Sequence, residues 1–158
     1  MSEASLLARI PAADRILIDT TVLAAYFDRT DATHPVAAYV LDQLVAPGRN
    51  PAVISMITVM EILIRPLRAS PPRHHTVLAF LQAHPNLELV PVDLQVAIEA
   101  AHLRADKNFK PPDALVVGTG IATQVGHLVT NDLNWSSRLS SMANRIRVVQ
   151  TSTFLPFP

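Results

Sequence analysis

Four acidic residues are placed so that their side chains could bind metal and support hydrolysis. Asp19 and Asp132 each follow a short apolar segment, and Glu61 and Asp113 fall near the start of helical patterns. Carboxylate oxygens are the ligands that Mg²⁺ and Mn²⁺ prefer. A bound divalent cation can activate water and neutralise charge on a phosphate group. The four residues therefore predict a metal-dependent phosphodiester hydrolase.

Each acid also has a purely structural interpretation. Asp19 could cap the helix that follows it. Thr58 and Glu61 match the capping-box pattern, and Asp113 in a first helical turn is favoured by the helix dipole. Asp132 suits a turn. Four such coincidences are less expected than one shared site, provided that the fold brings the four acids together.

Basic residues near these acids are candidates for holding a polyanion. The chain has 13 Lys and Arg against 13 Asp and Glu, so net charge alone predicts no attraction to nucleic acid. Any such cations must therefore act locally. The candidate substrate-binding residues are Arg65, Arg68, Arg73, Arg104 and Lys110. An ordinary solvated basic surface is the alternative interpretation of the same residues.

Length and composition restrict the class of protein. The chain has 158 residues, of which 49% are hydrophobic and 16% charged, as is typical of one globular domain. It contains no Cys, which excludes disulfides, thiolate metal sites and a cysteine nucleophile. Neither a signal-peptide pattern nor a membrane-length apolar run is present, so we expect a cytoplasmic protein.

Short apolar segments alternate with helical patterns along the chain. Strands are expected at residues 16–18, 52–54, 87–90, 127–129 and 146–149. Strands that alternate with helices form right-handed βαβ units and a parallel sheet covered on both faces. The predicted fold class is therefore α/β, a three-layer α/β/α domain with a central, mostly parallel sheet of about five strands. Ligands bind at the carboxyl ends of such strands, where the four acids are expected.

Other segments carry weaker patterns. The expected division is an N-terminal arm at residues 1–13, one domain at 14–150 and a Pro-rich tail at 151–158. Pro66 should end or kink the helix that begins near residue 57, and residues 65–75 should form an exposed basic loop. Residues 133–145 favour no particular structure.

Several segments carry a resemblance to a known family. They are Ile16 to Leu23, Thr33 to Pro35, Ser55 to Glu61, and Leu103 through Asp113 to Asp132. Together they resemble PIN-domain proteins, and most of all the VapC-like ribonuclease toxins of bacterial toxin-antitoxin pairs. The resemblance extends over residues 15–150, and its most specific part is the segment around Asp113 and Asp132.

The resemblance implies an endoribonuclease that depends on Mg²⁺ or Mn²⁺. The implied catalytic and metal-binding residues are Asp19, Glu61, Asp113 and Asp132. Thr20 and Thr130 fall where the family tends to place hydroxyls that orient the acids. The implied partners are an RNA substrate, a cognate antitoxin protein and a second copy of the chain in a homodimer.

Some positions depart from the family pattern. Thr21 stands where Asn or Ser is more common, and Asn134 stands where some members carry a further acid. Gly118 and Gly120 replace small alanines and should weaken their helix by about 1 kcal/mol each relative to Ala. Asn134 puts only an auxiliary ligand in doubt.

Two other functions fit parts of the same pattern. A catalytically inactive PIN-like module would bind RNA or protein without cleaving it, but would have no need of all four acids. A phosphatase could use Asp19 as a covalent nucleophile. That class usually needs a second acid two residues later, where Thr21 stands.

Overall fold

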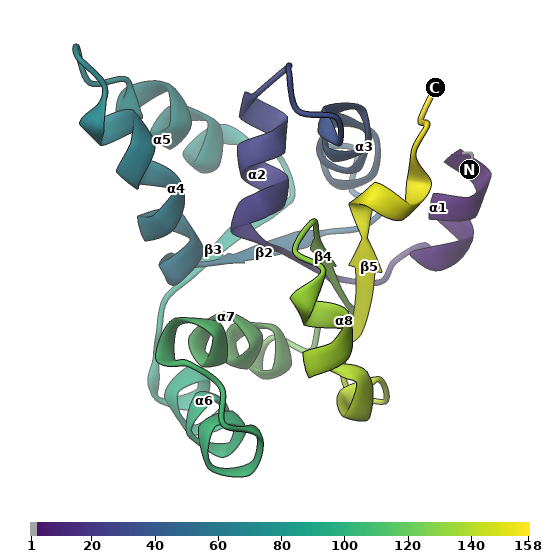
Figure 1. Cartoon of the computed structure of the whole chain (residues 1–158), viewed down its shortest axis with the longest axis vertical. Coiled ribbons are helices and arrows are strands. Elements are labelled where there is room, and N and C mark those ends of the chain that lie inside the picture. Colours follow the sequence, from purple (N-terminus) through teal and green to yellow (C-terminus); the bar gives the residue numbers. More distant parts are fainter. Residues whose placement is uncertain (1–2) are drawn as a thin grey trace.

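A five-stranded sheet forms the centre of the structure, a computed structural model that describes residues 3–158 (Figure 1). The strands are β1 (Ile16–Ile18), β2 (Ala52–Ser55), β3 (Leu87–Val90), β4 (His127–Thr130) and β5 (Arg147–Gln150). Their order is β3-β2-β1-β4-β5, and every neighbouring pair is parallel. The predicted α/β class and the parallel five-stranded sheet are both confirmed.

Strand residues alternate between two hydrophobic cores, one on each face of the sheet. In β1, Ile16 and Ile18 belong to one core and Leu17 to the other. In β4, Val129 and Leu128 divide in the same way. Successive side chains of a strand point to opposite faces, so a strand buried on both sides needs an unbroken apolar sequence. The short apolar runs in the sequence mark these strands for that reason.

Helices cover both faces and complete three layers (Figure 1). One face carries α1 (Glu3–Arg9), α2 (Thr20–Phe27), α3 (His34–Ala38), α4 (Met56–Arg68) and α5 (His74–Ala83). The other carries α6 (Leu94–Lys107), α7 (Pro111–Ala122) and α8 (Asn134–Arg138). A π-helical segment, Tyr39–Val45, continues α3, and short 3-10 turns lie at Ser140–Met142 and Thr151–Phe154. Within residues 3–158, no helix has the length and apolar character needed to cross a membrane.

The segment predicted as an exposed basic loop is mostly helical, so its predicted extent was wrong. α4 continues past Pro66 to Arg68, and α5 begins at His74, which leaves only residues 69–73 as a connection. Pro66 lies near the end of α4, where its missing N–H removes a single helical hydrogen bond. Arg65 and Arg68 consequently project from the last turn of a helix.

Both ends of the chain pack more firmly than the sequence predicts. Leu6 of α1 and Ile10 just after it are fully buried in the core beneath α2 and α3. At the other end Phe154 is buried, and the ring of Phe157 lies 5.2 Å from that of Tyr39. The expected arm and tail thus include ordered structure. The first two residues of that arm lie outside the described part of the chain.

Gly118 permits the close packing of α6 against α7. A Cβ at this position would lie 3.0 Å from both the carbonyl oxygen of Val96 and the amide nitrogen of Ala100. These are backbone atoms of α6, which cannot rotate away as a side chain can. The glycine therefore has a packing role that offsets its helix-propensity cost of about 1 kcal/mol.

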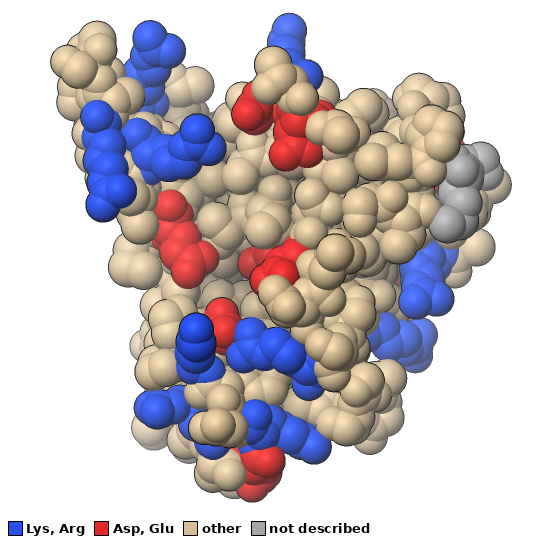
Figure 2. Space-filling model, in the orientation of Figure 1, with Lys and Arg blue, Asp and Glu red and all other residues tan. Residues whose placement is uncertain are grey.

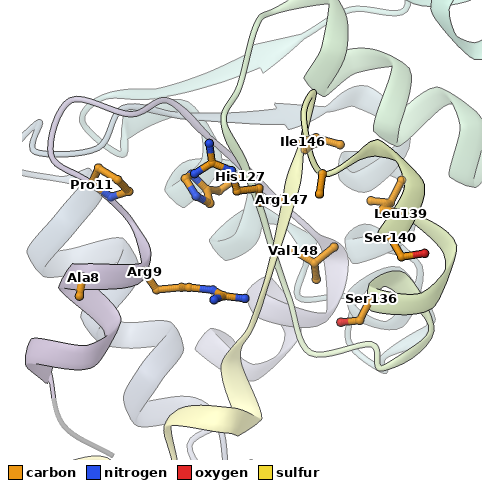
Figure 3. Close-up of a pocket in the computed structure, with 11 residues that line it drawn as sticks. Ala8, Arg9, Pro11, His127, Ser136, Leu139, Ser140, Ile146, Arg147 and Val148 are labelled. Carbon is orange, nitrogen blue, oxygen red and sulfur yellow. The ribbon is translucent and has the colours of Figure 1, made fainter.

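A cavity of about 420 Å³ lies beside the edge strand β5, away from the four acids (Figure 3). Arg9 and Pro11 line it on one side of β5, and Ser136 and Ser140 on the other. His127, the first residue of β4, also lines it and so marks the amino end of the strands. The cavity is therefore distinct from the carboxyl edge where ligands of such sheets bind.

His127 is buried at the wall of this cavity, with Nδ1 3.2 Å from Oδ2 of Asp14. Burial lowers the pKa of His127, because a charged imidazolium is disfavoured away from water. Asp14 opposes this effect, whereas Arg147 and Arg9 add to it. The folded protein therefore favours the neutral ring.

This burial predicts a loss of stability in weakly acidic solution. Stability due to neutral His127 is complete above the ordinary histidine pKa of about 6.5. It declines as the pH falls from there toward the lower pKa of the folded state, because the unfolded chain binds the proton more readily. His127→Gln should flatten the pH dependence of the unfolding midpoint below about pH 6.5. His102→Gln, at an exposed position of α6, is the matched control. Equal slopes for wild type and His127→Gln would contradict this account.

Candidate active site

Asp19 follows β1 directly, and its side chain is nearly buried, with only 7% of the residue exposed. It is the N-cap residue of α2 but makes no side-chain capping bond. Its Oδ2 instead accepts hydrogen bonds from the hydroxyls of Thr130 at 2.7 Å and Thr21 at 2.9 Å. Helix capping therefore does not explain this residue. Two hydroxyls hold the carboxylate in a single orientation.

β1 and β4 are the neighbouring strands between which the chain changes direction across the sheet. From β1 the chain adds β2 and β3 on one side, and it then returns to add β4 and β5 on the other. Connections that leave two adjacent strands in opposite directions open a crevice at their carboxyl ends. Asp19 and Thr130 stand at the ends of these two strands, and the amide of Asp19 donates to the carbonyl of Val129 at 3.1 Å. Strand order thus places Asp19 at the switch point of the sheet.

Glu61 reaches the same edge from α4. Its Oε2 accepts a hydrogen bond from the hydroxyl of Thr20, the residue after Asp19. The cap of α4 is Ser55, whose side chain accepts from a backbone amide at 3.3 Å. Thr58 lies inside the helix, so the capping-box explanation of Glu61 is wrong. Thr20 instead couples Glu61 to the end of β1.

Asp132 is joined to Asp19 through one threonine. The hydroxyl of Thr130 donates to Asp19 and accepts from the amide N–H of Asp132 at 3.0 Å. Oδ1 of Asp132 accepts from the backbone and side-chain amides of Asn134, at 2.9 and 2.8 Å. The predicted turn role of Asp132 is therefore realised through one oxygen. Its Oδ2 has no hydrogen-bond partner among residues 3–158.

Asp113 lies in the first turn of α7 and is held by a cation rather than by a hydroxyl. Its Oδ2 accepts from Nη1 of Arg138 at 2.7 Å, and 31% of each side chain is exposed. Arg138 ends α8, the short helix that follows Asp132. α8 therefore connects the fourth acid with the other three.

Acidic side chains surround a hollow on the face formed by the ends of α4, α7 and α8, with basic side chains on either side (Figure 2). Oxygen donors of this kind suit Mg²⁺ or Mn²⁺, and the nearly buried Asp19 has no ion-pair partner among residues 3–158. Within that described range, however, no three carboxylate or imidazole groups are already close enough to hold one ion. The donor chemistry fits a divalent cation, while the carboxylates would have to move closer together for three of them to bind one ion.

The predicted substrate cations differ in their distance from this hollow. Arg65 and Arg73 line a groove of about 560 Å³ that also contains Thr20 and Glu61. The other three are also exposed. Arg68 lies near the end of α4, Arg104 lies on α6, and Lys110 lies just before α7. The structure therefore associates Arg65 and Arg73 most directly with the acids.

Two residues that contact the acids escaped prediction. Thr21 donates to Asp19 and also accepts from the amide of Asn131 at 2.8 Å, whereas the sequence marked it only as a departure from the family motif. Arg138 lies in the segment without a clear pattern, so nothing in the sequence connected it with Asp113. A basic residue in the last turn of a predicted helix after Asp132 would have been the only available signal.

A model of the PIN domain matches residues 16–138 of this sequence. The chain belongs to the PIN-domain family. The match contains all four acids and the whole site described above. No curated protein matches the sequence closely enough to count as a relative.

Several solved structures, among them toxins and a toxin-antitoxin complex, have the same fold. A toxin-antitoxin complex from Klebsiella pneumoniae has 20% identity and a TM-score of 0.63, covering 86% of this chain and 97% of that one. VapBC2 from Rickettsia felis, bound to a promoter DNA fragment, has 16% identity and a TM-score of 0.66, with coverage of 85% and 97%. Mycobacterium tuberculosis VapC20, described as a Sarcin-Ricin loop cleaving toxin, has 16% identity and a TM-score of 0.62, with coverage of 77% and 93%. These likenesses confirm a VapC-like PIN fold.

The coupling of Asp19 to Thr130 can be measured in this PIN domain without metal. Thr130→Val should destabilise the protein by roughly 1.5–3 kcal/mol, the usual value of a hydrogen bond to a charged group. In an Asp19→Asn background the same change should cost clearly less, because the acceptor is no longer charged. Urea unfolding of the two single variants and the double variant gives this difference as a double-mutant cycle. Additive effects would contradict the coupling. Thr123→Val is the control, because the hydroxyl of Thr123 donates to backbone carbonyls of α7, away from Asp19.

Proposed function

We propose that this PIN-domain chain is a divalent-metal-dependent endoribonuclease and the toxin of a toxin-antitoxin pair. Its proposed catalytic and metal-binding residues are Asp19, Glu61, Asp113 and Asp132, with Thr20 and Thr130 in support. Family membership, the VapC-like fold and the position of the acids at the switch point of the sheet support the proposal.

The observation that carries the proposal is the environment of Asp19. A carboxylate that is 7% exposed is costly unless hydrogen bonds and a positive charge compensate it. Two threonine hydroxyls supply the hydrogen bonds, but no side chain among residues 3–158 forms an ion pair with it. A divalent cation would supply the missing charge. Helix capping, the main alternative, is not made.

Each side chain has a distinct part in the proposed reaction. Thr21 and Thr130 hold Asp19, and Asn134 holds one oxygen of Asp132 so that the other remains available. When bound, Mg²⁺ or Mn²⁺ supplies a water of lowered pKa as nucleophile and neutralises negative charge at the phosphate. No protein nucleophile is required. The phosphatase alternative finds no support, because Thr21 is committed to hydrogen bonds with Asp19 and Asn131.

RNA would be held by the cations beside the hollow. Arg65 and Arg73 share the groove that contains Glu61, and Arg68, Arg104 and Lys110 extend the basic surface on α4, α6 and α7. Contacts of this kind act on the phosphate backbone and position a strand without reading its bases. Cleavage specificity therefore has to come from other contacts or from RNA shape.

Asp19→Asn provides the central test. The variant keeps the shape of the side chain but removes the charge that faces the proposed ion. We expect Mn²⁺-dependent cleavage of RNA to fall by more than about 100-fold, beyond the 10–100-fold typical of residues that only support metal ligands. Chelation of the metal should abolish wild-type cleavage as well. The measurement is a time course of cleavage of a structured RNA by purified wild type and variant.

Asp42→Asn, on the remote segment Tyr39–Val45, is the matched control and should cleave like wild type. Intact cleavage by Asp19→Asn would refute the proposed site. Binding of RNA by wild type without any cleavage, over a range of Mg²⁺ and Mn²⁺ concentrations, would favour the catalytically inactive binding module.

The proposed antitoxin would occupy the groove between α2, α4 and α5. The groove combines apolar walls, which include Phe27 and Val77, with Arg65 and Arg73. An amphipathic segment with acidic residues would complement these walls, and at that position it would cover Glu61. A structure of the same fold from Klebsiella pneumoniae is a toxin-antitoxin complex, which supports an antitoxin partner, and the lining of the groove is the reason for placing the antitoxin there.

The proposed homodimer would use a second, more apolar surface on α4. Met56, Met60, Ile64 and Leu67 are all exposed there, between 41% and 54%. They recur at spacings of three or four residues and so form one stripe along the helix. An exposed stripe of this kind is typical of a protein-protein contact.

Native mass spectrometry tests the proposed homodimer and the proposed antitoxin complex separately. The chain alone should have the mass of a dimer, and co-expression with the protein encoded beside it should give a larger complex. Met60→Glu should shift the chain alone to a monomer, because a charge would be buried in the contact. Glu3→Gln changes a residue of α1, outside the stripe, and is the control. A strict monomer at all concentrations would overturn the dimer, and failure to associate with the encoded neighbour would overturn the antitoxin.

A further inference from the structure

Arg138 is held by three different groups beside the proposed site. Its guanidinium forms an ion pair with Asp113 at 2.7 Å and lies over the rings of Phe109 and Trp135, 4.4 and 4.9 Å from their centroids. Both rings are almost fully buried and stack on one another at 6.1 Å. The two rings thus form a platform that holds the guanidinium beside Asp113.

This ion pair occupies one oxygen of a proposed metal ligand. Asp113 is one of the four proposed ligands, and its Oδ2 is already occupied by Nη1 of Arg138. A metal ion bound by Asp113 would therefore share this carboxylate with a positive guanidinium, and the two cations would compete for its negative charge.

We propose that Arg138 is a positioning residue that holds Asp113 as an internal counter-cation and exchanges that carboxylate with the divalent metal. This inference rests on the proposed function of the site. When the carboxylate of Asp113 leaves Arg138 for the metal, the guanidinium keeps other stabilising contacts. Its cation–π contacts with Phe109 and Trp135 remain, and 31% of the side chain stays exposed to water. The loss of the ion pair therefore costs little free energy at Arg138. The strength of this ion pair sets the affinity of the site for metal.

The same pair keeps the metal-free site intact. Without Arg138, Asp113 would add an uncompensated charge to a hollow that already contains three other carboxylates, and like charges repel. Arg138 is thus expected to stabilise the empty site and to weaken its affinity for metal through one contact. A purely structural ion pair would contribute to stability alone and leave metal affinity unchanged.

Arg138→Met tests the exchange, because Met keeps an unbranched stem on the rings and removes the charge. Mn²⁺ affinity, measured by isothermal titration, should rise about three- to tenfold, the range expected from the loss of one competing, half-buried ion pair. Arg145→Met is the matched control, because Arg145 pairs with Glu99 at 3.2 Å outside the site. It removes the same formal charge and should bind Mn²⁺ like wild type.

Trp135 supplies a second readout that does not depend on catalysis. It is the only Trp of the chain, and its indole lies against the guanidinium. Mg²⁺ should shift its emission in wild type, because the cation beside the ring loses its anionic partner. The shift should be absent in Arg138→Met, and unchanged in Arg145→Met.

The possible outcomes separate this inference from the function on which it rests. Tighter Mn²⁺ binding by Arg138→Met, together with loss of the Trp135 response, supports the exchange. Equal affinities for wild type and Arg138→Met, with weaker binding by Asp113→Asn, overturn the exchange but leave the metal site standing. If no variant and no wild-type protein binds Mn²⁺ at millimolar concentration, both proposals fall. Should Arg138→Met not fold, Arg138→Gln replaces it, because it also removes the charge, and wild-type affinity in that variant also counts against the exchange.

Discussion

The carboxylate of Asp19 is the group around which the proposed site is organised. It lies at the end of the central strand β1, almost out of contact with water, and depends on the hydroxyls of Thr21 and Thr130 for its hydrogen bonds. Thr130 also binds the amide of Asp132, so one side chain fixes the relation of two acids from distant parts of the chain. Burial makes this arrangement costly without a positive charge and, for the same reason, suited to attract one.

The sheet imposes that arrangement through its strand order. β1 and β4 are neighbours only because the chain returns after β3 and adds its last two strands on the opposite side of β1. The middle positions of the two fully buried central strands are apolar, so Asp19 and Thr130 appear at the carboxyl ends of these strands. The proposed site thereby lies at the carboxyl edge, while the cavity beside His127 lies at the other edge.

The side chains of the four acids differ in the contacts that hold them. Asp19 and Asp132 are tied to strand ends by Thr130, and Glu61 is bound by Thr20 from a neighbouring helix. Asp113 is the exception, because its partner is the charged Arg138, which can keep its ring contacts when the carboxylate leaves. A site with one exchangeable carboxylate can remain stable when empty and still complete a metal shell. This difference follows from the group that each acid contacts, a hydroxyl or a charged guanidinium. The number of acids alone does not reveal it.

The sequence alone determined the class of fold, because buried parallel strands require apolar runs. It also proposed the four acids of the candidate site, because residues that follow such strands line the edge where ligands bind. Local patterns failed where partners are remote: Leu6 and Phe154 proved to be core residues, and α4 extended beyond Pro66. Only the tertiary structure could decide that Thr21 holds Asp19 or that Arg138 pairs with Asp113, 25 positions away. Such pairings depend on strand order and helix packing, which no local spacing of residues encodes.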